Sequence, residues 1–313
     1  MWHVGILPKL AATGVSGPAF SWFQDFLSAR SQRTVVGASI SDALPISAGV
    51  PQGGILSSLL FIVYVNDLPA AILKGEANLF ADDTSVYVAH KDTQCLQHHL
   101  QAAVDEVQLW MFTWLVSVNA LKSAVMVFRT PRMARPSISK LVCGDVIKQT
   151  SVHRHLGLHL DECLTWSAQV SHVTSKASQR IGLLHRLCHK LSSVIIRAIY
   201  LATVQPITDY ACLVWGPGLR KGDSTRLERV HRRAARLMSG TKLADNVSHE
   251  LLLARAGLSP LAEHRQYRLA QFASKLVHGF VPEHLLESTD HWFTPLPEQS
   301  QTLRSVVNFG YLT

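Results

Sequence analysis

The sequence predicts an α+β fold up to about residue 150 and a mainly α-helical fold after it. Three observations lead to this prediction. Short β-branched runs bounded by turn residues alternate with helical patterns in the first part. Apolar residues recur at helical spacing from Thr93 to Trp114, and from Ser167 onward the pattern is mainly helical. With 313 residues, 47% of them hydrophobic, the chain is long enough for one large domain or two modest ones.

The first elements follow from local signals. Residues 17–29 read as a helix with a proline near its start, and residues 34–39 and 43–47 read as two short strands. Residues 49–54 hold three glycines and a proline, which predicts a shaped loop. The apolar run of residues 55–65 is too long for most strands, so we expect a buried helix.

The next elements complete the α+β part. Residues 79–88 are expected to form two strands with Asp82 and Asp83 at the bend, followed by the amphipathic helix of residues 93–114. Residues 125–128 read as a strand, and residues 130–150 as a connection with a short hairpin. The helical pattern of the second part is broken at Pro206 and at residues 216–218.

Charge is unevenly distributed along the chain. Residues 1–130 hold seven lysines and arginines against nine acidic residues, whereas residues 176–236 hold twelve against three. The second segment therefore accounts for the whole net charge of +8 and favours a polyanionic partner. A solvated helical surface is the alternative interpretation of such a run.

The sequence contains no signal for a membrane or for secretion. Its longest apolar run is too short to cross a bilayer, and the N-terminus lacks the features of a signal peptide. Five widely spaced cysteines without CxxC spacing predict neither disulfide partners nor a thiolate zinc site. The histidines at 153, 155, 159, 185 and 189 lack cysteine or acidic partners at ligand spacing and read as surface residues. We expect an intracellular protein, nuclear or cytoplasmic.

The pair Asp82 and Asp83 is the candidate catalytic and metal site. Two carboxylates at a hairpin bend between apolar strands suit Mg²⁺, which prefers oxygen ligands. Taken alone, such a pair is usually a solvated turn. The run Gly49-Val50-Pro51-Gln52-Gly53-Gly54 upstream, leading into an apolar helix, changes this interpretation.

Together these residues resemble the PQG motif, the following helix and the aromatic-Ala-Asp-Asp motif of reverse transcriptases from non-LTR, jockey-like retrotransposons. Gly54 departs from the serine usual in that family. The resemblance implies a right-hand polymerase palm, an antiparallel sheet with packed helices, followed by a helical thumb. It also implies an RNA template, a DNA primer, deoxynucleoside triphosphates and two Mg²⁺ ions. Pro51, Gln52 and Gly53 would then contact the template or the nucleotide.

Other segments extend the resemblance. Asn119 and Lys122 resemble the family's Asn-x-x-Lys element, in which the lysine would act as general acid. Leu156 and Gly157 resemble the primer-grip hairpin. On this basis we expect a palm over residues 1–150, a primer-grip hairpin and thumb over 151–240, and a helical or irregular region over 241–313.

Arginines are the candidate contacts for the nucleic-acid backbone. Arg30 and Arg33 lie just before the first predicted strand, although exposed arginines beside a strand are more often only solvated. Five more occupy one arc of a helix whose other arc is apolar. They are Arg226, Arg229, Arg232, Arg233 and Arg236. A purely structural surface helix is the alternative.

The family's palm has a third carboxylate on a strand that precedes a Trp-His segment. Here Trp2-His3 resembles that segment, so we expect an N-terminally truncated polymerase that is inactive alone. A non-catalytic nucleic-acid-binding module derived from a retroelement is the second hypothesis, and a protein-interaction scaffold the third. Salt-dependent nucleic-acid binding separates the last two.

Overall fold

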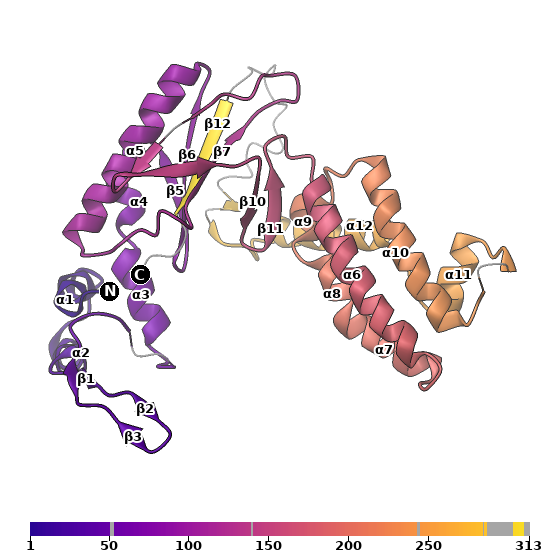
Figure 1. Cartoon of the computed structure of the whole chain (residues 1–313), viewed down its shortest axis with the longest axis horizontal. Coiled ribbons are helices and arrows are strands. Elements are labelled where there is room, and N and C mark those ends of the chain that lie inside the picture. The colour runs from indigo at the N-terminus through magenta and orange to yellow at the C-terminus, as the bar shows by residue number, and fades with distance from the viewer. Residues whose placement is uncertain (51–52, 139, 243–244, 284, 287–302, 310–313) are drawn as a thin grey trace. The chain divides into compact units, whose positions relative to one another are not determined.

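The computed structural model describes residues 1–50, 53–138, 140–242, 245–283, 285–286 and 303–309, of which 140–141 and 303–309 are described by their backbone alone (Figure 1). The chain divides into two compact units. The first comprises Met1–Ser151 with Gln301–Thr313, and the second comprises Val152–Ser300. Sheet and helices mix in the first unit and helices dominate the second, so the predicted α+β class is confirmed.

The first unit begins with two helices and a long hairpin. Helix α2 (Gly17–Leu27) lies within the predicted helix of residues 17–29, with Pro18 in its first turn, whereas α1 (His3–Ala12) was not predicted. Four two-residue strands follow: β1 (Ser31–Gln32), β2 (Val35–Val36), β3 (Ser39–Ile40) and β4 (Leu44–Pro45). Strand β1 pairs with β4 and β2 with β3, which makes one exposed hairpin in place of the two longer predicted strands.

The predicted buried helix is only partly buried. In helix α3 (Ser57–Val65), Leu60 and Tyr64 are buried, but Ile62 is 51% exposed. Ile55, just before the helix, is 95% exposed. The apolar run suggested burial on all sides, yet the described part of the chain packs against one face of this helix. The short helix α4 (Leu68–Ala71) continues it, with Leu68 in the core.

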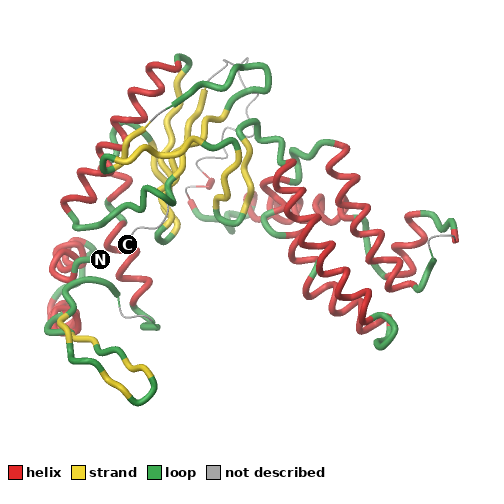
Figure 2. Tube along the Cα trace, in the orientation of Figure 1, coloured by secondary structure: helices red, strands yellow, loops and turns green. Residues whose placement is uncertain are grey.

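A six-stranded sheet forms the centre of the first unit (Figure 2). Its strands are β5 (Glu76–Phe80), β6 (Asp83–His90), β7 (Ala124–Phe128), β8 (Lys140–Val142), β9 (Asp145–Gln149) and β12 (Leu303–Phe309). They lie in the order β5-β6-β12-β7-β9-β8. Neighbouring strands are antiparallel except β7 and β9, which are parallel. The sequence pattern did not predict β12.

Helix α5 (Thr93–Thr113) supplies the largest part of this unit's core. Asp92 caps it by accepting a hydrogen bond from the Cys95 N–H at 2.8 Å. Seven residues at helical spacing are buried on the face that meets the sheet, as the amphipathic pattern predicts: Leu96, Leu100, Ala103, Val104, Val107, Trp110 and Met111. They pack in one cluster with valines of β6 and β7.

The second unit is a hairpin followed by helices. Strands β10 (Val152–His155) and β11 (Leu158–Asp161) pair antiparallel. The helices are α6 (Ser167–Leu187), α7 (Ser193–Thr203), α8 (Gln205–Asp209), α9 (Cys212–Trp215), α10 (Lys221–Ser239), α11 (His249–Ala256) and α12 (Leu261–Val277). Pro206 lies in the first turn of α8, and residues 216–218 separate α9 from α10, as predicted.

Two further observations concern sequence predictions. Within the described residues, no helix is both long and apolar enough to cross a membrane. All five cysteines have free thiols in the structure.

Candidate active site and nucleic-acid surface

The two candidate metal ligands lie at the tip of the β5–β6 hairpin. Phe80 pairs with Asp83 across a loop of two residues, Ala81 and Asp82, and Ala81 has a φ of 53°. Both carboxylates are partly exposed, and neither has a partner among the described residues. Their oxygens are therefore available to a hard divalent cation, and the donor set fits Mg²⁺.

The register of the sheet brings Lys122 to the same end as this hairpin. Ser85 of β6 pairs with Asn308 of β12, which in turn pairs with Ala124 of β7. Strands β6 and β7 consequently run in the same direction. Asp83 lies two residues before Ser85, and Lys122 lies two residues before Ala124. Neighbouring strands are about 4.8 Å apart, so the two backbones are about 10 Å apart. The Lys122 side chain is exposed.

The turn before β7 holds Lys122 in place. The Lys122 N–H donates to both the backbone carbonyl and the side-chain oxygen of Asn119, each at 3.1 Å. Ser123, which is buried, donates its hydroxyl to the same carbonyl at 2.9 Å. The predicted Asn-x-x-Lys element therefore forms a closed turn at the start of a strand.

Of the three predicted template-binding residues, Pro51 and Gln52 lie outside the described residues. Gly53 is exposed and has a φ of 80°, a conformation that favours glycine, and a Cβ atom there would meet nothing within 4 Å. The N-terminal residues hold the entry to this loop. The His3 Nε2 atom lies 3.0 Å from the carbonyl oxygen of Gly49. The backbone N–H of Gly49 donates to the carbonyl oxygen of Met1 at 2.7 Å.

No third carboxylate joins Asp82 and Asp83 among the described residues. Among those residues, the histidine, cysteine and acidic side chains that converge in a group of three are His90, Asp92 and Cys95. Asp67 is occupied elsewhere, as the Asp67 Oδ1 atom accepts hydrogen bonds from Lys9 at 2.5 Å and from Trp110 at 3.1 Å.

Sequence reasoning missed the role of Lys9. Its side chain is 8% exposed, donates to the Tyr64 carbonyl at 2.6 Å and lies 3.6 Å from the centroid of the Trp114 ring. Burial lowers the pKa of Lys9, and the hydrogen bond to Asp67 opposes that shift. The sequence signal for a buried Lys9 was its place next to Leu10, on the side of α1 that is buried.

Leu156 and Gly157, the predicted primer-grip residues, form the turn of the β10–β11 hairpin. Their φ angles are 44° and 81°, and two positive values in sequence are typical of a type I′ turn. The Tyr210 hydroxyl donates to the Leu156 carbonyl at 2.8 Å. A Cβ atom on Gly157 would lie 3.1 Å from the Tyr210 ring, so both the turn and this packing favour glycine.

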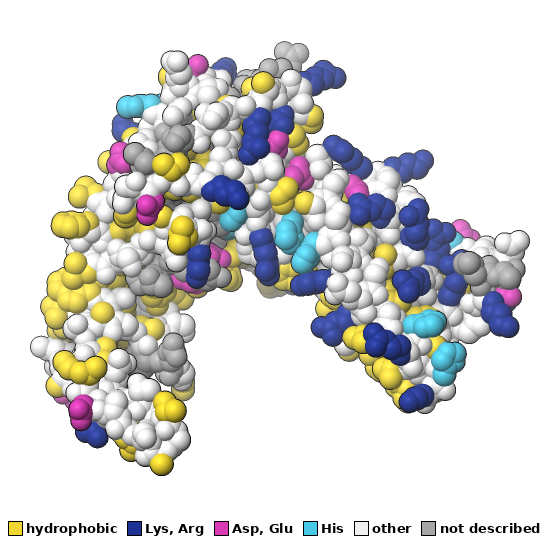
Figure 3. Space-filling view, in the orientation of Figure 1, with side chains coloured by type: hydrophobic (Ala, Val, Ile, Leu, Met, Phe, Trp, Pro, Cys, Tyr) yellow, Lys and Arg dark blue, Asp and Glu magenta, His cyan; other side chains and the backbone are white. Residues whose placement is uncertain are grey.

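Helix α10 separates its arginines from its apolar residues as predicted. Leu227 and Ala234 are buried, while Arg229 and Arg233 are exposed and Arg232 and Arg236 partly so. Figure 3 shows lysine and arginine side chains along the helices of the second unit.

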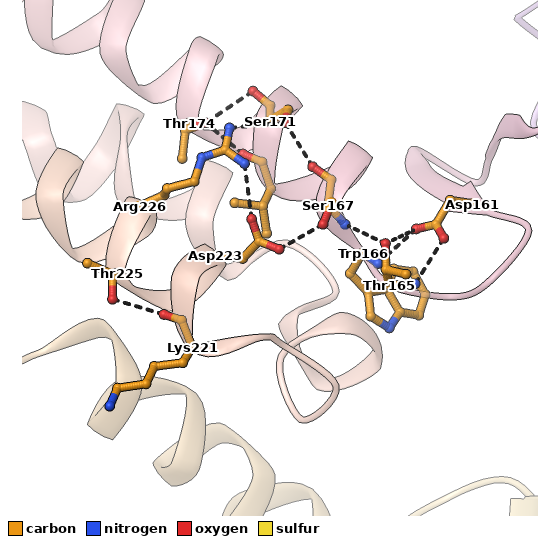
Figure 4. A network of polar contacts seen from close by, with 11 residues as sticks. Asp161, Thr165, Trp166, Ser167, Ser171, Thr174, Lys221, Asp223, Thr225 and Arg226 are labelled. Atoms are coloured by element: carbon orange, nitrogen blue, oxygen red, sulfur yellow. Dashed lines mark hydrogen bonds and ion pairs between the residues drawn. The ribbon is translucent and has the colours of Figure 1, made fainter. Parts of the chain in front are cut away.

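Among the described residues, Arg226 has polar partners that the other arginines of α10 lack (Figure 4). Its guanidinium donates to the Asp223 carboxylate at 3.0 Å and to the Ser171 hydroxyl at 3.1 Å, and Asp223 accepts from Ser167 at 2.8 Å. These contacts join α10 to α6. Of the two N-terminal arginines, Arg33 is exposed, whereas Arg30 donates to the carbonyl of Phe26 in the preceding helix α2 at 3.2 Å.

Comparisons with known proteins give one consistent family. Residues 1–163 match the family of reverse transcriptases, which are RNA-dependent DNA polymerases. A probable RNA-directed DNA polymerase from transposon X-element of Drosophila melanogaster is 26% identical over 247 residues, which are 77% of this chain and 27% of that protein.

Two polymerases of the mobile element jockey are equally similar. The one from Drosophila melanogaster is 27% identical over 250 residues, or 77% of this chain and 27% of the relative. The one from Drosophila funebris is 27% identical over 248 residues, or 76% and 26%. The chain thus spans about a quarter of the length of these relatives.

Proposed function

The chain belongs to the reverse transcriptase family, and from this premise we propose that it is a part of an RNA-directed DNA polymerase of a non-LTR retrotransposon. The observation that carries the proposal is the β5–β6 hairpin, which presents two adjacent carboxylates without partners among the described residues at the sheet end where Lys122 also lies. In this proposal the sheet unit is the polymerase palm, and the helices after residue 151 are its thumb.

Each group at the sheet end has a role in nucleotidyl transfer. Asp82 and Asp83 would hold Mg²⁺, which activates the attacking hydroxyl and neutralises the developing charge on the phosphates when bound. The ammonium of Lys122 has a proton to donate to the departing pyrophosphate. Gly53 of the glycine-rich loop has no Cβ atom to keep a base pair or nucleotide away from its backbone.

The second unit would hold the product of the reaction. The tight turn at Leu156 and Gly157, supported by Tyr210, offers its backbone to the primer end. The exposed Arg229 and Arg233 offer positive charge to phosphates. RNA template, DNA primer and deoxynucleoside triphosphates are the substrates that this assignment implies.

A non-catalytic nucleic-acid-binding module is the second candidate. It is favoured by one observation, the absence among the described residues of a third carboxylate beside Asp82 and Asp83. Loss of one member of a catalytic group typically lowers the rate by several orders of magnitude. We therefore expect no measurable DNA synthesis by the chain alone, and activity once a relative's fingers and first carboxylate strand are fused before Trp2.

Primer extension on an RNA template with Mg²⁺ tests both candidates. The fused protein is compared with its Asp82→Asn and Asp83→Asn variants. Asp145→Asn is the matched control, because Asp145 also follows a two-residue hairpin turn of the same sheet and is exposed. Extension lost in the first two variants and retained in the control supports the polymerase. Equal extension by all four proteins contradicts the metal-site assignment. A folded fusion that binds primer–template without extending it favours the binding module.

A further inference from the structure

Three basic side chains from two elements of the second unit line one cleft, and a histidine from a third element packs against one of them. The cleft has a volume of about 350 Å³ and is lined by Arg154 of β10 and by His172 and Lys176 of α6, together with Gly157 and Tyr210. The ring of His159, which belongs to β11, packs against the ring of His172, with the two ring centroids 4.3 Å apart. Neighbouring positive and protonatable groups repel one another, so their concentration here needs a physical explanation.

The hairpin and the helix are held in register at this place. The backbone N–H of His159 donates to the side-chain oxygen of Gln169 at 2.9 Å, and Gln169 is 2% exposed. The His159 side chain is partly buried, and its Nε2 atom is buried without a hydrogen-bond partner among the described residues. A buried nitrogen without a partner costs about 1–3 kcal/mol, so the surroundings of this ring need an explanation.

Neither imidazole is compensated by an acid. Burial lowers the pKa of His159, and the positive charges of Arg154 and Lys176 lower it further. Burial likewise lowers the pKa of His172, followed by the effects of His159, Lys176 and Arg154. Carboxylates contribute to neither shift.

The acidic groups on the adjoining segments are engaged with other partners. Asp161, at the end of β11, accepts hydrogen bonds from the backbone of residues 163–166. Asp209, at the end of α8, contacts His264 at 3.1 Å and Arg268 at 3.9 Å. The Tyr210 hydroxyl, which also faces the cleft, donates to the Leu156 carbonyl. The cleft therefore presents uncompensated positive charge.

We propose that this cleft binds one phosphodiester group of a nucleic-acid strand, with Arg154 and Lys176 as fixed charges, His172 as a proton-dependent donor and His159 as the imidazole that packs against it. The inference rests on the proposed function, and it adds a phosphate subsite beside the primer-grip turn. A phosphodiester carries one negative charge and several acceptor oxygens, which matches two cations and one imidazole that line a small cleft. It carries no base information, so binding should be independent of sequence.

A bound phosphate changes the balance at the histidines. Its negative charge opposes Arg154 and Lys176 and raises the imidazole pKa values, so binding takes up a proton. Affinity should therefore rise as pH falls, by up to about tenfold per pH unit for each proton taken up. The effect is confined to the pH range between the pKa values of the free and the bound forms.

Fluorescence anisotropy of the full chain with a homopolymeric single strand of about 16 nucleotides measures both effects. The test variant Arg154→Gln with Lys176→Gln changes two exposed side chains and should fold normally. Its matched control, Arg186→Gln with Lys190→Gln, removes the same charges from exposed positions outside the cleft lining. We expect the test variant to lose affinity several-fold more than the control, with a salt slope smaller by about 0.7 for the one phosphate contacted.

The pH arm uses His159→Gln with His172→Gln. Wild-type affinity should increase as pH is lowered from about 8 to about 6, and the double histidine variant should lose this dependence while keeping its fold by circular dichroism. If that variant does not fold, the pH response of the Arg154 and Lys176 variant decides instead, since the loss of the site removes the response.

Each outcome is informative. Equal losses in the cleft variant and its control overturn the subsite and leave the proposed polymerase intact. A wild-type chain that binds no nucleic acid overturns both. Binding of inorganic phosphate or of a deoxynucleoside triphosphate at the cleft, without any effect of the variants on oligonucleotide affinity, assigns the cleft to a small anion and overturns the phosphodiester.

Discussion

The exposed arginines of α10 provide the sharpest test of how the second unit meets nucleic acid. We predict that changing Arg229 and Arg233 together to Gln flattens the salt dependence of binding without unfolding the protein. Both side chains are exposed, and they lie one helical turn apart on the face opposite Leu227 and Ala234. Phosphate contacts act by releasing condensed counterions, so each lost contact removes a fixed part of the slope.

The magnitude follows from the number of contacts. Two phosphates on a duplex account for about 1.8 in the slope of log affinity against log salt, at about 0.9 each. A fourfold rise in salt should therefore reduce wild-type affinity by about 12-fold more than variant affinity. Similar losses are expected on unrelated sequences, because backbone contacts carry no sequence information.

Arg226 of the same helix is the matched control. Its contacts with Asp223 and Ser171 are structural, and Asp223 is 7% exposed. Arg226→Gln should therefore lower the free energy of unfolding by about 1–2 kcal/mol, the lower part of the range for a charged hydrogen bond because Arg226 is itself half-exposed. Arg226→Gln should change the salt slope less than the double change of Arg229 and Arg233 does.

Anisotropy over a salt series, run beside a thermal melt, distinguishes these effects. An unchanged slope in a folded Arg229 and Arg233 double variant refutes the reasoning and removes α10 from the nucleic-acid surface. Membership of the reverse transcriptase family would stand, since it rests on residues 1–163.

Three further predictions concern stability. Lys9→Met should cost about 2 kcal/mol, because it leaves Asp67 without its buried cation, and a melt in denaturant with an unchanged or raised midpoint would contradict this. Stability should fall as pH drops below about 6.5, since burial lowers the folded-state pKa of His231 and the unfolded state takes up the proton first. Melts over a pH series check this, and His231→Gln should show a weaker dependence. Asp161→Ala removes four hydrogen bonds to residues 163–166 and should cost about 2–4 kcal/mol, whereas a loss below about 0.5 kcal/mol in a calorimetric scan would show that this turn closes without the carboxylate.

Local patterns in the sequence were sufficient for several elements. The helix of residues 93–114 was readable because seven buried positions recur with the helical period. The hairpin at residues 79–88 was readable because short strands flank residues that turn, whereas the hairpin around Leu156 and Gly157 was expected from the family resemblance. The family was recognisable from residues 49–83 for a similar reason, as a glycine-rich loop, an apolar helix and two adjacent carboxylates follow one another at fixed spacing.

Contacts between residues distant in the sequence needed the tertiary structure. No local pattern tells that residues 303–309 pair with both β6 and β7, more than 170 residues away, and so bring Asp83 and Lys122 to one sheet end in a common register. Nor does a helical wheel separate Arg226 from Arg229, because the partner Ser171 belongs to another helix. Side-chain roles of this kind depend on which surfaces meet in space.

The same limit applies to the basic cleft and to Lys9. Arg154, His159 and Lys176 read as separate surface groups along the chain, and they become a candidate phosphate site because β10, β11 and α6 pack together. Lys9 reads as one cation on a short helix, and it is a core residue because Asp67 and Trp114, which are far from it in sequence, close around its ammonium. Hydrophobic period and turn chemistry act between neighbours along the chain, whereas burial and charge compensation are decided by packing in three dimensions.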